Sequence, residues 1–428
     1  MSAPLLLSLY RAASSALAPL SGAWIQARAR KGKEAPERVA ERFGRYRQTR
    51  PQGALIWLHA ASVGESGVAL TLLSALRAAR PEAHFLITTG TRTSAALVAR
   101  RAPDCLHAFA PLDAPAYVRR FLDHWRPDLG VFIESELWPN LMLEAKSRSV
   151  RLALVNARLS PSSLARWMKW RASGQTLFSA FDAVSAADAR TAQALSHLRG
   201  ASVNARGNLK LAARANPIDA DALAKLREDI GARPVWAAIS THAGEDEIVL
   251  AAHKRLMADQ PEALLILIPR HPERGEAIAA LADAAPRRAL GQAPGAGPVY
   301  IADTMGELDL FLSLAPVCFI AGSLLPHLKG HSPVEPAQCG SAIITGPFTE
   351  SFEDLYADLS SRGAMRLAAD AAEIAFAVST LQRDQTQRAR QCEAARAAIS
   401  GGAEALAETL ALLEPLLPRR ESPAHATA

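Results

Sequence analysis

The sequence predicts an α/β protein made of two Rossmann-like domains that face each other across a cleft. Three observations lead to this prediction. The chain has 428 residues, which is more than a single compact core usually contains. Short apolar segments alternate with helical segments, the pattern of a parallel sheet covered on both faces. This alternation occurs in two series, which are separated by an acidic stretch around Pro217.

The first series predicts an N-terminal domain at residues 51–208. Its expected strands are 54–59, 84–88, 129–133 and 151–155. Its expected helices include one that ends at Arg80 and two more at 114–124 and 141–147. Residues 209–234 are interpreted as the interdomain connection, because the alternation pauses there and only a short helix is expected.

The second series predicts a C-terminal domain at residues 235–418. Its expected strands are 235–239, 264–268, 299–301, 317–321 and 342–345. A helix rich in Ala, Leu and Glu is expected near 404–416 as the last element of this domain. The polar residues 419–428 are expected to form a disordered tail.

Residues 1–50 are a separate, basic segment with an apolar beginning. They contain ten Lys or Arg and three Glu, a net charge of +7, whereas the whole chain has +6. The uncharged run 12–26 is shorter than the roughly 20 residues that cross a bilayer. A signal peptide would carry its positive charges before such a run. An interfacial helix with a basic collar on anionic lipid head groups is therefore favoured, with a membrane span or a helix packed on its own protein as the alternatives.

Several function classes find little support in the sequence. The residues after position 50 have a net charge near −1, which argues against a nucleic-acid partner. Four cysteines are widely spaced, which indicates neither a disulfide framework nor a structural zinc site. The one Asp-x-Asp motif, at 219–221, lies away from any strand end, so we expect no metal and no cofactor. No Gly-x-Ser-x-Gly elbow indicates a serine hydrolase.

Polar side chains follow the strands of the first domain, where ligands of parallel sheets bind. Ser62, Gly64 and Glu65 follow the first strand, and Glu65 is either a helix cap or a general base. Glu134 and Glu136 follow the strand 129–133, and two nearby carboxylates raise the pKa of one of them. A capping acid before a helix that begins with Pro139 is the alternative there. Arg158 and the basic stretch 166–171 are suited to acceptor phosphates or to a solvated helix face.

The second domain repeats this arrangement at five successive positions. Hydroxyl groups, backbone amides at helix starts and a guanidinium are the groups that bind a nucleotide phosphate. A carboxylate at a helix start, here Glu335, can accept hydrogen bonds from ribose hydroxyls. The candidate binding residues are Ser240, Thr241, Pro269, Arg270, Met305, Gly306, Glu307, Gly322, Ser323, Ser332 and Glu335. Together they predict a nucleotide site in this half.

Eight motifs in one order resemble those of the 3-deoxy-D-manno-octulosonic acid (Kdo) transferases, which build the inner core of lipopolysaccharide. The motifs are HAASVGE (59–65), ELWPN (136–140), NARLS (156–160), GNLK (207–210), STHAGE (240–245), PRHPER (269–274), DTMGEL (303–308) and AGS (321–323). The resemblance implies a GT-B fold, CMP-Kdo as donor and lipid IVA as acceptor. It also implies inversion at the anomeric centre without a metal, on the cytoplasmic face of the inner membrane.

The resemblance also implies roles for individual residues. Glu65 matches the proton acceptor of the family, and Glu136 and Lys210 match its transition-state stabilisers. The segments at 269–270, 305–307 and 332–335 match its CMP contacts. Lys329 and Ser332 depart from the Gly and Asn of the family, so a CMP contact at Ser332 is expected to be lost or bridged by water. A nucleotide-sugar epimerase and a non-catalytic membrane scaffold are the alternative functions.

Overall fold

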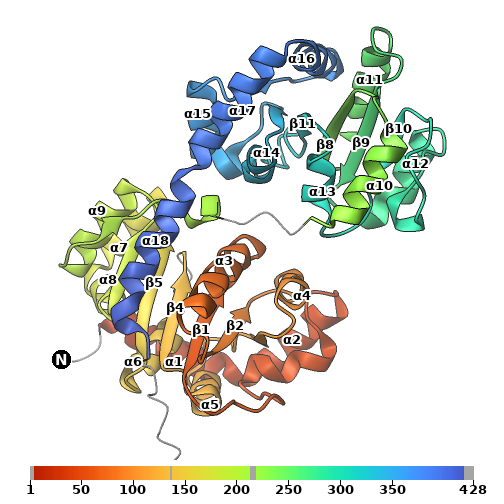
Figure 1. The fold of residues 1–428 in the computed structure, drawn as a ribbon. Helices are drawn as coiled ribbons and strands as arrows, with labels where there is room; N and C mark the ends of the chain where they lie inside the picture. Colours follow the sequence, from red (N-terminus) through yellow and green to blue (C-terminus); the bar gives the residue numbers. More distant parts are fainter. Residues whose placement is uncertain (1–3, 135–136, 213–217, 419–428) are drawn as a thin grey trace, which may run out of the picture. The chain divides into compact units, whose positions relative to one another are not determined.

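The computed structural model describes residues 4–134, 137–212 and 218–418, and these form two compact units. Unit 1 comprises residues 1–213 together with 401–428, and unit 2 comprises residues 214–400. Each unit contains a parallel sheet with helices on its faces (Figure 1). The predicted fold class, two Rossmann-like α/β domains, is confirmed.

The sheet of unit 1 has seven strands in the order β3-β2-β1-β4-β5-β6-β7. The strands are β1 (Leu55–Ala60), β2 (His84–Thr89), β3 (Leu106–Phe109), β4 (Leu129–Ile133), β5 (Arg151–Ala157), β6 (Ala183–Ala186) and β7 (Asn204–Ala205). All pairings are parallel. The order reverses between β1 and β4, so the carboxyl ends of these two strands form the switch point at which open α/β sheets bind ligands.

Helices cover both faces of this sheet. They are α1 (Leu5–Leu17), α2 (Ser21–Arg30), α3 (Val63–Ala79), α4 (Arg92–Arg101), α5 (Pro115–Trp125), α6 (Pro139–Ser147), α7 (Pro161–Lys169), α8 (Arg171–Phe178), α9 (Ala189–Arg199) and α18 (Gly401–Leu413), with 3₁₀ turns η1 (Ala18–Leu20), η2 (Pro36–Phe43), η3 (Leu209–Ala212) and η7 (Glu414–Leu416). Alternate residues of β1 enter different cores. Trp57 packs with Phe121 and Phe132 on one face, whereas Ile56 and Leu58 pack on the other.

The sheet of unit 2 has six parallel strands in the order β10-β9-β8-β11-β12-β13. The strands are β8 (Val235–Thr241), β9 (Leu264–Pro269), β10 (Val299–Ile301), β11 (Val317–Ile320), β12 (Ala342–Thr345) and β13 (Met365–Leu367). The helices are α10 (Ala220–Ile230), α11 (Asp246–Met257), α12 (Gly275–Leu281), α13 (Leu308–Leu312), α14 (Val334–Cys339), α15 (Glu353–Ser361), α16 (Ala371–Arg383) and α17 (Gln385–Ile399), with 3₁₀ turns η4 (Pro272–Arg274), η5 (Arg288–Leu290) and η6 (Glu350–Phe352). Here the switch point lies between β8 and β11.

The domain boundaries differ from the predicted ones at the C-terminus. The final helix was expected in the C-terminal domain, but α18 belongs to unit 1. Its residues Ala405 and Leu413 are buried in the core that also contains α3 and one face of β1. The segment 209–234, expected as a connection, is divided between η3 of unit 1 and α10 of unit 2. The predicted disordered tail, 419–428, lies outside the described residues.

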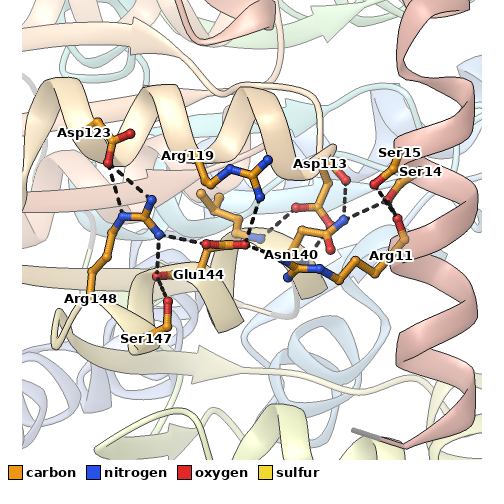
Figure 2. Close-up of polar contacts among 11 residues, drawn as sticks. Arg11, Ser14, Ser15, Asp113, Arg119, Asp123, Asn140, Glu144, Ser147 and Arg148 are labelled. Atoms are coloured by element: carbon orange, nitrogen blue, oxygen red, sulfur yellow. Dashed lines mark hydrogen bonds and ion pairs between the residues drawn. The ribbon is translucent and has the colours of Figure 1, made fainter.

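The N-terminal helices pack on unit 1 through one side. This packing was one of the alternatives that the sequence left open for residues 1–50. Leu7 of α1 and Ile25 of α2 are buried. The Tyr10 hydroxyl donates to the Asp113 carboxylate at 2.9 Å. Figure 2 shows two more attachments of α1, an ion pair from Arg11 to Glu144 at 2.7 Å and a hydrogen bond from the Asn140 side-chain amide to Ser14 at 2.9 Å.

The same helices expose a set of large apolar side chains on their other side. These are Leu5, Leu9, Leu17, Leu20 and Trp24, with exposed fractions between 53% and 73%. Among the helices that the structure describes, none is long and apolar enough to cross a membrane.

Candidate functional site

Strained backbone marks the carboxyl ends of three strands. Glu134 directly follows β4, Asn156 lies near the end of β5, and Ser240 lies near the end of β8. Their φ angles are 62°, 54° and 58°, in the left-handed region that residues with a side chain rarely adopt. Such strain costs on the order of 1–3 kcal/mol per residue and tends to occur at functional sites. Two of these residues, Glu134 and Ser240, lie at the switch points of their sheets.

Glu65 occupies the first turn of α3, where it forms a capping box with Ser62. The Ser62 hydroxyl accepts a hydrogen bond from the Glu65 backbone N–H at 3.3 Å, and it donates to the Glu65 carboxylate at 2.8 Å. The backbone N–H of Ala61 donates to the other carboxylate oxygen at 2.6 Å. The structure therefore shows the helix cap that the sequence left as one reading of Glu65. A capping carboxylate can still accept a proton from a ligand.

The environment of Glu65 favours proton uptake. Only 6% of the residue is exposed, and this burial raises the pKa of its carboxyl group above the ordinary value. The negative charge of Glu134 raises the pKa further, while the hydrogen bonds from Ser62 and Ala61 lower it. A carboxylate with a raised pKa at the carboxyl end of a central strand is suited to general-base chemistry near neutral pH.

Glu134 and Lys210 form an ion pair beside Glu65. The Lys210 ammonium lies 2.5 Å from the Glu134 carboxylate. A Cβ atom added at Gly64 would lie 3.9 Å from that ammonium and 3.7 Å from the adjoining methylene. The end of the lysine side chain therefore lies against the start of α3. Glu65, Glu134 and Lys210 are brought together from α3, the end of β4 and η3.

Glu134 was part of the predicted pair of carboxylates, but the catalytic role was assigned to Glu136. Glu136 lies outside the described residues, so its predicted role stays a prediction. Glu134 could have been singled out, because it is the first residue after the buried strand 129–133 and therefore opens the loop at the switch point. Arg158, the remaining predicted residue of this half, is half-buried just after β5.

In unit 2, three histidines and an arginine gather at the ends of the central strands. The Nε2 atoms of His242 and His331 are 2.8 Å apart, and the two rings are stacked. The His271 ring meets the His242 ring edge-on at 5.8 Å. Burial, His242 and Arg270 lower the pKa of His331 to about 4. Burial also lowers the pKa of His242, so the pair is neutral at neutral pH and can gain a proton when an anion binds.

The residues around this cluster include Ser240, Thr241, Pro269 and Arg270. The exposed Arg270 follows Pro269, the last residue of β9, and its backbone N–H donates to the Thr241 carbonyl at 3.0 Å. No hydrogen bond or ion pair joins its guanidinium to another residue of the described chain. A guanidinium in this position is suited to a phosphate.

The AGS loop after β11 is held by a buried carboxylate. Glu245 accepts hydrogen bonds from the backbone N–H groups of Gly322, Ser323 and Leu324 at 2.8–3.0 Å. The Ser323 hydroxyl donates to the Ile320 carbonyl and accepts from the Gly346 N–H. The Ser323 hydroxyl thus donates its proton within the protein, and its predicted ligand contact stays a prediction.

Gly322 is required for a steric reason. Its φ is +71°, and a Cβ atom there would lie 2.4 Å from the His331 ring. The missing side chain therefore makes room for the histidine pair. Gly322 shapes the candidate site through space, and its backbone N–H is already bonded to Glu245.

Three other predicted contacts have partners within unit 2. Glu307 binds the Arg288 guanidinium at 2.6 Å and accepts a short hydrogen bond from Thr304, and the Arg288 bond lowers the pKa of this carboxyl. The Ser332 hydroxyl donates to Glu335 at 2.8 Å at the start of α14. Met305 is 55% exposed, and Gly306 has a φ of +89°.

Lys329 has a φ of +63°, in the left-handed region where glycine is the usual residue. The lysine at this position, where the Kdo transferases have glycine, is therefore strained in its backbone.

The sequence predicts no metal site in either unit. In residues 4–134, 137–212 and 218–418, no group of three His, Cys, Asp or Glu side chains is placed to hold a metal ion. Asp219, from the only Asp-x-Asp motif, accepts the backbone N–H groups of Asp221 and Ala222 at the start of α10. Its role in the structure is that of a helix cap.

Comparison with known proteins relates the chain to one family. A model of the 3-deoxy-D-manno-octulosonic-acid transferases (kdotransferases) matches residues 37–213. The chain is 35% identical to the 3-deoxy-D-manno-octulosonic acid transferase of Haemophilus influenzae, over 90% of this chain and 92% of that protein. It is 34% identical to the protein of the same description from Bordetella pertussis, over 96% of this chain and 99% of that one.

Comparison with solved structures concerns the fold. The UDP-GlcNAc 2-epimerase from Neisseria meningitidis, solved with bound UDP-GlcNAc, matches with a TM-score of 0.58. The match covers 85% of this chain and all of that chain, at 12% sequence identity. At this identity the similarity shows the fold alone. The epimerase and the present chain share two α/β domains of the GT-B type.

Proposed function

Because this chain belongs to the Kdo transferase family, we propose that it is an inverting, metal-independent enzyme that moves Kdo from CMP-Kdo to lipid IVA. The observation that supports this most is the arrangement of Glu65, Glu134 and Lys210 at the switch point of unit 1. It combines a buried base with a raised pKa and a paired cation. A glycosyl transfer to a hydroxyl group needs both kinds of group.

In the proposed reaction Glu65 accepts the proton of the acceptor hydroxyl, the 6′-hydroxyl of lipid IVA. The hydroxyl oxygen attacks the anomeric carbon of Kdo from the face opposite the phosphate, which inverts that centre. The bond between the anomeric carbon and the phosphate oxygen breaks, and CMP leaves with the electron pair. General-base assistance of this kind contributes about 10²–10⁴-fold in rate.

We assign Lys210 to the stabilisation of charge that develops during this step. Its ammonium is held by Glu134 at 2.5 Å and is 32% exposed, so it can also face a ligand. The family resemblance gives this lysine the same role. Glu134 then serves to orient the ammonium and to keep the pKa of Glu65 high.

We assign the donor to unit 2. Arg270 offers an exposed guanidinium cation to a phosphate. The paired imidazoles of His242 and His331 lie nearby and can accept a proton. Burial keeps both histidines neutral without a ligand, and an anion beside them favours their protonated forms. CMP is the nucleotide that the family resemblance implies.

We propose that the N-terminal helices lie on the cytoplasmic face of the inner membrane, where the acceptor is embedded. The attachments of α1 to Asp113, which precedes α5, and to α6 turn one side of α1 toward the protein and leave Leu5, Leu9 and Leu17 exposed. Together with Leu20 of η1 and Trp24 of α2, these exposed side chains make up what we call the apolar face. The last turn of α2 carries the exposed Arg30, which suits anionic head groups, and Arg28, whose guanidinium pairs with Glu34 at 2.8 Å.

Binding to vesicles tests this placement. The variant Leu5→Ser/Leu9→Ser is expected to reduce co-sedimentation with vesicles of phosphatidylethanolamine and phosphatidylglycerol at least about tenfold, since each buried leucine contributes about 1.5–3 kcal/mol. The matched control is Leu281→Ser/Leu290→Ser, which removes two exposed leucines of unit 2. Equal vesicle binding of both variants and the natural protein would contradict the assignment of the apolar face.

A product assay distinguishes the proposed function from its rivals. The protein is incubated with CMP-Kdo and lipid IVA in detergent, and the lipid is examined by mass spectrometry. A transferase adds the mass of one or more Kdo residues to the lipid and releases an equal amount of CMP. An epimerase, which the shared fold leaves as the second candidate, would change neither the lipid nor the amount of free CMP. A lipid of unchanged mass would reject the proposed function.

A further inference from the structure

The C-terminal helix α18 begins on the backbone of the turn that carries Lys210. Figure 1 shows α18, in blue, running beside the sheet of unit 1, and its first residues contact η3. A Cβ atom added at Gly402 would lie 2.3 Å from the Leu211 carbonyl carbon and 2.5 Å from the Ala212 nitrogen. Real Cβ atoms do not approach backbone atoms so closely. At the neighbouring Gly401, an added Cβ would meet no atom within 4 Å.

The same turn is held from the other side by Asn156. The Leu209 backbone N–H donates to the Asn156 side-chain oxygen at 2.8 Å, in a buried position. Asn156 is 2% exposed and has a φ of 54°, one of the strained positions at the strand ends. The side chain of Leu209 is itself buried, with 1% exposed. The backbone of η3 is therefore fixed between the end of β5 and the start of α18.

This fixation determines where the Lys210 ammonium can lie. A lysine side chain has four rotatable carbon–carbon bonds, so its direction depends on where its own backbone starts. Lys210 passes the start of α3 at Gly64 and reaches Glu134 at 2.5 Å. A shift of η3 by about 1 Å would move the point from which the lysine side chain reaches Glu134, and misplacements of that size can lower a rate about 100-fold.

We propose that Gly402 and Asn156 are positioning residues, which place the Lys210 ammonium for catalysis by clamping the backbone of η3. The inference rests on the proposed role of Lys210. In this proposal the helix α18 affects the reaction rate through Lys210, although none of its own side chains contacts the reacting atoms. It also gives a steric reason for the glycine at the second position of α18.

Two neighbouring substitutions test the proposal, because they add the same methyl group to the same helix end. In Gly402→Ala, kcat is expected to fall about 10–100-fold, while KM for CMP-Kdo stays within about twofold because the donor is assigned to unit 2. In Gly401→Ala, kcat and KM are expected to equal those of the natural protein. Wild-type turnover of a folded Gly402→Ala variant would overturn the proposal.

A double-mutant cycle separates positioning from a general loss of structure. If Gly402 acts through Lys210, the variant Gly402→Ala/Lys210→Ala is expected to be as active as Lys210→Ala alone. If Gly402→Ala lowers kcat by the same factor in the Lys210→Ala variant as in the natural protein, then Gly402 supports the fold and does not act through the lysine. If Gly402→Ala does not fold by circular dichroism, Asn156→Ala takes its place in the cycle with the same expectations.

The cycle also distinguishes this proposal from the proposed function. Normal turnover of Lys210→Ala itself would reject the catalytic role of the lysine, whatever the glycine does. A slow Lys210→Ala with an unaffected Gly402→Ala would reject the clamp alone.

Discussion

Replacing Glu65 with Gln is expected to lower kcat about 10²–10⁴-fold, the range that a general base contributes. Glutamine has nearly the same shape and can keep one of the two capping hydrogen bonds, from Ala61 or from Ser62. It cannot accept a proton at neutral pH. The affinity for CMP, measured by calorimetry, is expected to stay unchanged because the nucleotide is assigned to unit 2. Turnover near the natural rate would remove Glu65 from the proposed mechanism.

A matched control separates the capping role from the chemical role. Glu373 in the first turn of α16 accepts the backbone N–H of Ala369 at 2.8 Å, with the same four-residue spacing as Glu65 and Ala61. Glu373→Gln changes a helix cap of the same kind in unit 2. Glu373 is exposed whereas Glu65 is buried, so this control reports the loss of the capping role alone, on the order of 1 kcal/mol in the free energy of unfolding. Only Glu65→Gln should lower kcat.

The pH profile gives a second signature of Glu65. Burial and Glu134 raise the pKa of its carboxyl, and the base must be ionised to act. The value of kcat/KM should therefore rise with pH through a midpoint above about 4.3, the ordinary pKa of glutamate. Glu134→Gln removes the neighbouring negative charge, so the midpoint should move to lower pH. A midpoint that stays fixed or moves upward in this variant would show that the two carboxylates do not interact as the structure indicates.

The sequence predicted the sheets well because each parallel strand carries its signal locally. The strands β4, β10 and β12 begin and end at the predicted residues, as expected for short apolar segments bounded by polar ones. The strands β3, β6, β7 and β13 were not predicted. They are at most four residues long and lie toward the sheet edges, where fewer apolar residues are needed. Their positions depend on partners far along the chain.

The candidate site was predicted in part, and the difference has a physical cause. The motif order led to Glu65 and Lys210, which are 145 positions apart, and the structure places both beside Glu134. The left-handed backbone at Glu134 could not be read from the sequence, because no glycine or asparagine stands there. The same holds for α18. Its composition predicts a helix, but its burial in the core of unit 1 through Ala405 and Leu413, and the close contact of Gly402 with η3, depend on residues far away in the sequence.

Lys210→Ala is the second substitution with a large expected effect, a loss of about 10²–10³-fold in kcat, as for other groups that stabilise developing charge. The loss has two components, because removing the ammonium also leaves the Glu134 carboxylate without its partner at 2.5 Å. The variant Lys210→Met/Glu134→Gln removes both charges and keeps both shapes.

If Lys210 acts directly on the departing phosphate, this double variant should be as slow as Lys210→Met alone, because restoring neutrality does not replace the cation. If the double variant instead regains most of the natural kcat, the lysine serves only to neutralise Glu134 and does not stabilise the transition state. Single-turnover measurements at saturating CMP-Kdo distinguish these results, since they report the chemical step without product release. The kcat values expected for the double variant differ by about 100-fold between the two cases. This variant therefore distinguishes a lysine that neutralises Glu134 from one that stabilises the transition state.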